Sequence, residues 1–195
     1  MRRAILVVDP DTNHRARLRT LLAAIHSRVI GEASDPEEAM RQAVMTTPDL
    51  AIVAAELASG DGIHLASRLA TEHGVPSVLL SPPLAPMEIE RAAQAGVMGM
   101  LVKPVYPSIL RGMLEVAICR FQEMSALRRE AEALRRTLEN RKLIERAKGL
   151  LMEMKGIPEQ EAFAHIRQKS MNSNRTMAER ARAVILAAEI DGSTR

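Results

Sequence analysis

The sequence predicts an α/β fold with a doubly wound, five-stranded parallel sheet, followed by a long coiled-coil helix and a small all-α domain of three helices. Short apolar runs alternate with amphipathic stretches over the first hundred residues, as in repeated β-α units. From Pro107 to Gly156 there is no proline or strong turn signal, which predicts one long helix, or two joined at a bend. We therefore divide the chain into residues 1–107, 108–140 and 141–195.

The five strands and the helices between them follow from the apolar pattern. Residues 4–8, AILVV, are an uninterrupted apolar run, typical of a strand buried on both faces. Asp35-Pro36 reads as a helix N-cap followed by proline at the first helical position. The remaining strands are expected at 28–33, 50–55, 77–81 and 99–102, with helices at 12–25, from Pro36, at 62–73 and at 86–95. In such a fold the working site lies beyond the carboxyl ends of the strands.

The residues at those strand ends carry a family resemblance. They are Asp9 with Asp11, Ala54, Ser81 and Lys103. The strings ILVVDPD, PDLAIVAAELASGDGIHLA, VPSVLLS and AGVMGMLVKP, over residues 3–118, resemble a two-component response-regulator receiver domain. The resemblance implies an aspartate nucleophile after the third strand, an acidic pair that holds Mg²⁺, and a Ser/Thr and a Lys that bind the phosphoryl oxygens.

Two of these parts are missing from the sequence. Ala54 stands at the phospho-acceptor position and has no oxygen to attack with, and Pro10 replaces the second carboxylate. Glu56 and Ser59 are poor substitutes for the acceptor because they follow it in a different strand register. Asp9 is expected to pair with Lys103 rather than to hold a cation with Asp11. We interpret the domain as a pseudo-receiver, with no catalytic residue, metal or cofactor.

Apolar residues at coiled-coil spacing mark the connecting helix. One set contains Leu114, Ala117, Phe121 and Met124, and a second contains Leu127, Ala131, Leu134 and Leu138. The two sets join by an extra three-residue step, which is a stammer in a coiled-coil seam. We expect a homodimer through Leu114, Phe121, Leu127, Leu134 and Leu138. The alternative is a helix that packs back on its own domain.

Positive charge is concentrated in the closing helices. Residues 1–107 carry 10 Lys and Arg against 12 Asp and Glu, whereas residues 141–182 carry 10 against 5. This asymmetry favours a polyanionic partner, although a basic helix face is often only solvated.

The apolar stripe of the first closing helix is expected to bury Ala147 and to leave Lys148 on the opposite side. Phe163 is expected in the core, and Thr176 to Glu179 forms a capping box for the last helix.

Gly149 interrupts the first closing helix, where glycine costs about 1 kcal/mol relative to alanine. Close helix packing and close approach of a nucleotide to Ala147-Lys148-Gly149 explain it equally well on the residues alone.

The closing sequence AKGLLMEMKGIPEQEAFAHIRQKSMNSNRTMAERA resembles the ANTAR domain, an RNA-binding module of bacterial antitermination regulators. The resemblance covers about residues 138–187, and the whole order of parts is similar to nitrate- or amide-responsive members. It implies binding of a double-hairpin leader mRNA that prevents terminator formation. The residues expected to bind RNA are Arg141, Arg146, Ala147, Lys148, Gly149, Arg167, Lys169 and Arg175.

The sequence thus predicts an RNA-binding transcription antiterminator rather than an enzyme. Control by a sensor or ligand-binding regulatory protein, or by dimerisation, is expected instead of phosphorylation. The alternatives are a DNA-binding response regulator and a protein-interaction adaptor. No apolar run is long enough to span a bilayer, no signal peptide is evident, and Cys119 is the single cysteine, so a cytoplasmic protein without membrane contact is expected.

Overall fold

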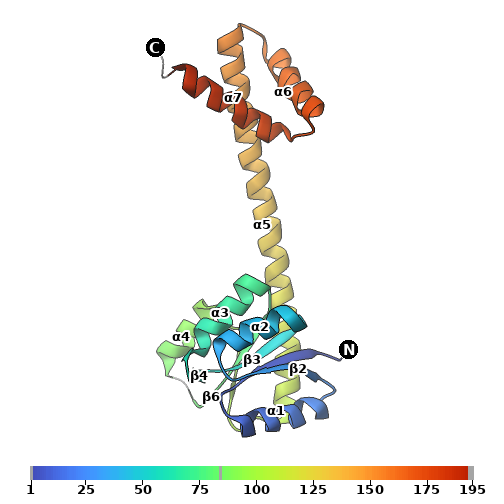
Figure 1. Cartoon of the computed structure of the whole chain (residues 1–195), viewed down its shortest axis with the longest axis vertical. Helices are drawn as coiled ribbons and strands as arrows, with labels where there is room; N and C mark the ends of the chain where they lie inside the picture. The colour runs from blue at the N-terminus through green and yellow to red at the C-terminus, as the bar shows by residue number, and fades with distance from the viewer. Residues whose placement is uncertain (1, 84, 193–195) are drawn as a thin grey trace. The chain divides into compact units, whose positions relative to one another are not determined.

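The computed structural model describes residues 2–83 and 85–192, and the side chains of residues 2–83 and 85–189. They form two compact units, Met1–Ser125 and Ala126–Arg195. Helix α5, Pro107–Lys155, is a single helix of 49 residues that contributes to both units (Figure 1). The predicted long helix is therefore present without a break.

The first unit contains the predicted five-stranded parallel sheet. The strand order is β2-β1-β3-β6-β7, and every neighbouring pair is parallel. The strands are β1 (Ala4–Val8), β2 (Arg28–Ala33), β3 (Leu50–Ala54), β6 (Ser77–Ser81) and β7 (Gly99–Val102). A small antiparallel hairpin of β4 (Glu56–Leu57) and β5 (Gly60–Asp61) follows β3 and was not predicted.

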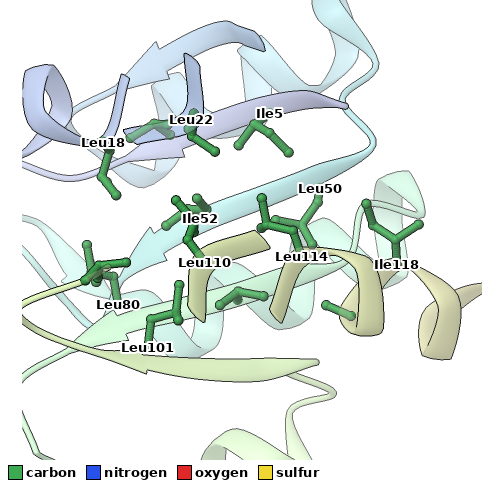
Figure 2. Close-up of a cluster of buried hydrophobic side chains, with 14 residues drawn as sticks. Ile5, Leu18, Leu22, Leu50, Ile52, Leu80, Leu101, Leu110, Leu114 and Ile118 are labelled. Atoms are coloured by element: carbon green, nitrogen blue, oxygen red, sulfur yellow. The ribbon is translucent and has the colours of Figure 1, made fainter. Parts of the chain in front are cut away.

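Alternate strand residues point to opposite faces of the sheet and build two cores. Ile5 and Val7 pack with α1 (Thr12–Ala24) and the start of α5, in the cluster shown in Figure 2. Leu6 and Val8 pack on the other face with α2 (Pro36–Thr46), α3 (Gly62–His73) and α4 (Pro86–Gln94). The uninterrupted apolar strands predicted this arrangement, because a strand covered by helices on both faces needs apolar residues at every position.

The start of α5 belongs to the core of the first unit. Leu110, Leu114 and Ala117 are fully or almost fully buried against the sheet. The prediction that Leu114 lies in a dimer seam is wrong, because its own domain already buries it. Over this part of the helix the alternative, packing back on its own domain, is correct.

Further along α5, all residues from 126 to 139 are exposed. Leu127, Leu134 and Leu138 have exposed fractions of 65%, 60% and 60%. Phe121, which belongs to the first apolar set of the predicted seam, is half-buried. The second half of the predicted seam is thus apolar and uncovered by the chain itself.

The second unit packs the end of α5 against α6 (Glu159–Ser173) and α7 (Met177–Gly192). Ala147, Leu151, Ala162, Ile166, Ala181 and Ile185 form its core. The capping box of α7 is confirmed, since the Thr176 hydroxyl accepts from the Glu179 N–H at 3.2 Å and the Glu179 carboxylate accepts from the Thr176 N–H at 2.8 Å. Helix α6 ends at Ser173, and its C-cap Asn174 has a left-handed φ of 51°.

No helix in the described part of the chain is long and apolar enough to cross a membrane.

Candidate functional sites

The ends of the parallel strands bring together the residues that correspond to a receiver's phosphoryl site. The Lys103 Nζ lies 3.6 Å from Oδ2 of Asp9, and the Lys103 N–H donates to the Ser81 carbonyl at 3.1 Å. Ala54 ends β3 between these strands and is 5% exposed. The expected pairing of Asp9 with Lys103 is confirmed. At the acceptor position the structure presents only a methyl group.

The two remaining carboxylates hold the backbone of the β1–α1 turn. Asp9 is 2% exposed, and its Oδ1 accepts from the Asp11 N–H at 2.8 Å. Asp11 is the N-cap of α1, where its carboxylate accepts from the N–H of Asn13 at 2.7 Å and of His14 at 3.4 Å. The hydrogen bond from Asn13 is the main reason that the pKa of Asp11 is lowered. Oδ1 of Asp9 and the carboxylate of Asp11 thus hold the backbone of this turn, whereas the buried Oδ2 of Asp9 has no hydrogen-bond partner among the described residues.

Lys148, expected on the open side of α5, lies instead between two carboxylates. Only 8% of the residue is exposed, and its Nζ is 2.7 Å from the Glu145 carboxylate and 2.6 Å from the Glu159 carboxylate. Glu159 is in the first turn of α6, so this contact joins α6 to α5. The prediction that Lys148 faces away from the packed side is wrong, because the following helix folds back over it.

This pairing shifts the pKa values of both partners. Hydrogen bonds from Glu145 and then Glu159 raise the pKa of Lys148, and the bond with Lys148 lowers the pKa of Glu159. A lowered carboxylate pKa stabilises the fold above the ordinary glutamate range, and this contribution disappears as the pH falls through the lowered value. The raised pKa of Lys148 also stabilises the fold, and this contribution is lost only as the pH rises above the ordinary lysine range.

Replacing Glu159 with glutamine should therefore lower the thermal midpoint at pH 7 by a small amount, on the order of 2 °C, because the carboxylate is largely exposed. The difference from the wild-type protein should shrink as the pH falls below the glutamate range. Thermal unfolding followed by circular dichroism between pH 3.5 and 7 measures it. Glu161→Gln, in the same helical turn without an ion pair among the described residues, is the matched control. An equal, pH-independent loss in both variants would contradict the bridge.

Ala147 and Gly149, on either side of Lys148, have different surroundings. Ala147 is fully buried in the core of the second unit, so its side chain cannot touch RNA in this conformation. Gly149 is half-buried, and a Cβ built on it would meet no neighbouring atom within 4 Å. Close helix packing within the chain therefore does not require glycine at this position.

An exposed aromatic residue lies on the same side of α6 as Glu159. Phe163 is 41% exposed, which contradicts its expected burial. Glu159, Phe163 and Arg167 follow one another at four-residue spacing and share a helix face. On α5, Arg141, Lys148 and Met152 share a face by the same rule, with Gly149 beside them. The Lys148–Glu159 contact joins these two helix faces, and we refer to them together as the α5–α6 face, with Arg141, Lys148, Gly149 and Met152 on α5 and Phe163 and Arg167 on α6.

The other residues expected to bind RNA lie elsewhere on the second unit. Arg146 pairs with Glu189 of α7 at 3.0 Å. Arg175 is exposed in the turn between α6 and α7. Lys169 lines a groove of about 250 Å³ between α6 and α7, together with His165, Ile166, Arg180, Ala183, Val184 and Ala187. His165 and Arg180 were not predicted, since their approach depends on how the two helices pack.

Comparison with known proteins agrees with both units. The receiver-domain model of response regulators matches residues 5–115, and the ANTAR-domain model matches residues 132–185. The transcriptional regulatory protein PdtaR of Mycobacterium tuberculosis is 37% identical over 183 residues, which cover 94% of this chain and 89% of PdtaR. The nitrate regulatory protein of Klebsiella oxytoca is 40% identical over 63 residues, covering 32% of this chain and 16% of that protein.

A solved structure matches the first unit. The receiver domain of a modulated diguanylate cyclase from Desulfovibrio desulfuricans is 29% identical, with a TM-score of 0.59 over 64% of this chain and 99% of that one. The match to PdtaR spans nearly the whole chain, so the similarity is to the complete order of domains and not only to the common receiver fold. The chain belongs to the response regulators that carry an ANTAR domain after a receiver domain, a family of transcription regulators.

Proposed function

We propose that the protein is an RNA-binding transcription antiterminator that binds a double-hairpin leader RNA and prevents a terminator hairpin from forming. The observation that carries the proposal is the exposed Phe163 beside Arg167 on the α5–α6 face. An unpaired loop base can stack on an exposed ring, and such stacking contributes about 1–3 kcal/mol per base.

The shape of RNA supports a loop as the target. An A-form duplex hides its base edges in a deep, narrow groove, whereas loop bases are unstacked and reachable. Gly149 leaves the surface of α5 smooth at this position, and Arg141 on α5 and Arg167 on α6 supply positive charge to the α5–α6 face. Arg175 and Lys169 extend the positive charge toward α7. We assign phosphate contacts to these arginines and lysines and loop-base contacts to Gly149 and Phe163.

The proposed control acts through binding rather than phosphorylation. Ala54 offers no acceptor oxygen, and Asp9 and Asp11 already bind backbone N–H groups. Dimerisation through Leu127, Leu134 and Leu138 would give two copies of the second unit, one for each hairpin of the leader. A sensor or ligand-binding regulatory protein that covers one of these surfaces would switch the activity.

Competition between nucleic acids tests the proposal. The full-length protein is bound to a fluorescent double-hairpin leader RNA at several salt concentrations, and the complex is challenged with the same RNA or with duplex DNA of equal length. We expect the RNA to compete at least tenfold better than the DNA. A preference for the duplex would identify a DNA-binding regulator, and no binding to either at moderate salt would identify a protein-interaction adaptor.

A further inference from the structure

A cavity of about 290 Å³ lies in the first unit next to the degenerate phosphoryl site. Helix α1 forms one side of it, and the end of β6 and the turn after β7 form the other. Leu18 and Leu80, from opposite sides, lie at the same end of the core cluster in Figure 2. The lining residues are His14, Arg17, Leu18, Leu21, Leu80, Lys103, Pro104 and Val105.

The lining divides into an apolar wall and a basic margin. Leu18, Leu80 and Val105 are buried and Leu21 is half-buried, so the wall is aliphatic. Every polar side chain of the lining is basic, because these are His14, Arg17 and Lys103, and no acidic residue of the described chain lines the cavity. The combination suits a ligand with an apolar body and a negative end.

Two of the three basic side chains, Arg17 and Lys103, can bind an anion. Arg17 is exposed and makes no ion pair with any described residue. The Lys103 Nζ has one distant carboxylate, Asp9 at 3.6 Å, and donates to Nδ1 of His14 at 3.1 Å. With a methyl group at Ala54, no phosphoryl group forms there to engage Lys103.

The nearby carboxylates limit the charge of the ligand. Asp9 lies 3.6 Å from the Lys103 Nζ, and Asp11 lies 3.5 Å from Nδ1 of His14. A dianion would bring a second negative charge toward these groups, whereas a single carboxylate can be held by Arg17 and Lys103 from the open side. The volume of about 290 Å³ lies just below the range for small-molecule sites, roughly 300–1,000 Å³, so the apolar body must be small.

We propose that the cavity between α1 and the β7–α5 turn binds a small organic monocarboxylate, with its carboxylate on Arg17 and Lys103 and its apolar body against Leu18, Leu21 and Leu80. This site is separate from the α5–α6 face and does not depend on RNA binding. It gives the receiver-like unit an input that does not require phosphorylation.

Ligand-observed saturation-transfer NMR on the full-length protein tests the site. The probes are phenylacetate, its neutral amide phenylacetamide, acetate without an apolar body, and inorganic phosphate. We expect saturable binding of phenylacetate, at least tenfold weaker binding of the amide, and no binding of acetate or phosphate in the same concentration range.

Two variants locate the binding. Arg17→Gln, at an exposed position, should weaken phenylacetate binding about tenfold and leave the circular dichroism unchanged. Leu21→Trp should fill the cavity and abolish binding. Arg28→Gln, another exposed arginine without an ion pair among the described residues, should bind as the wild type.

The outcomes separate clearly. Equal binding of acid and amide, stronger binding of phosphate, or full binding by Arg17→Gln would each overturn the proposal. Absence of phenylacetate binding to the wild-type protein would overturn it too, and would leave the cavity to a side chain of a protein partner.

Discussion

Replacing Phe163 with alanine should weaken binding of a double-hairpin leader RNA by about 10- to 100-fold, without changing the slope of log affinity against log salt. The ring is 41% exposed and lies outside the core of the second unit, so the fold should survive its removal. Stacking on a neutral ring releases no counterions, which is why the salt slope should stay constant. Fluorescence anisotropy at several salt concentrations measures both quantities.

Replacing Arg141 and Arg167 with glutamine provides the complementary result. Two lost phosphate contacts should reduce the magnitude of the slope by roughly 1.5 and lower the affinity on the order of 30-fold at moderate salt. The matched controls are Met171→Ala, an exposed apolar residue of α6, and Arg28→Gln with Arg41→Gln, exposed arginines of the first unit. If the controls lose as much affinity as the test variants, the α5–α6 face is not the RNA site.

The second large effect concerns the exposed leucines of α5. Replacing Leu127, Leu134 and Leu138 with glutamine should convert a dimer into a monomer at micromolar concentration. Each leucine buried in a seam contributes about 1.5–3 kcal/mol, and a dimer buries six of them. Because all three are at least 60% exposed within the chain, the substitutions should leave each unit folded. Sedimentation equilibrium measures the mass, and circular dichroism checks the fold.

Substitutions on the opposite side of the same segment supply the control. Arg129, Glu132 and Arg136 lie about half a turn away from the leucines by helical spacing, and their replacement with glutamine should leave the dimer intact. A wild-type protein that is monomeric at the same concentration would contradict the seam. A leucine variant that remains dimeric would place the dimer contact on another surface.

The sequence was sufficient for the fold of the first unit because its signals are local. AILVV and the other apolar runs match the observed strands within a residue at their ends, and Asp35-Pro36 caps α2 as predicted, with the carboxylate accepting from the Glu38 N–H at 2.9 Å. The β4–β5 hairpin was missed because two-residue strands have no periodicity to detect.

The errors concern contacts between segments that are distant in the sequence. A heptad pattern shows which residues share a face but not what covers it, so Leu114 was assigned to a partner when its own sheet buries it. Lys148 was placed on the open side because Glu159, which pairs with it, belongs to the next helix. Phe163 was assigned to the core because aromatic residues usually are buried, yet Ala162 and Ile166 already fill that side of α6.

Gly149 shows where the chain departs from its own stability optimum. A methyl group at this position would meet no neighbouring atom within 4 Å, and alanine in a helix interior is more favourable than glycine by about 1 kcal/mol. The isolated domain would therefore gain from the substitution, and nothing in its packing opposes it. In the proposed complex, glycine at this position lets the RNA approach the α5 backbone closely, at a cost in folding free energy.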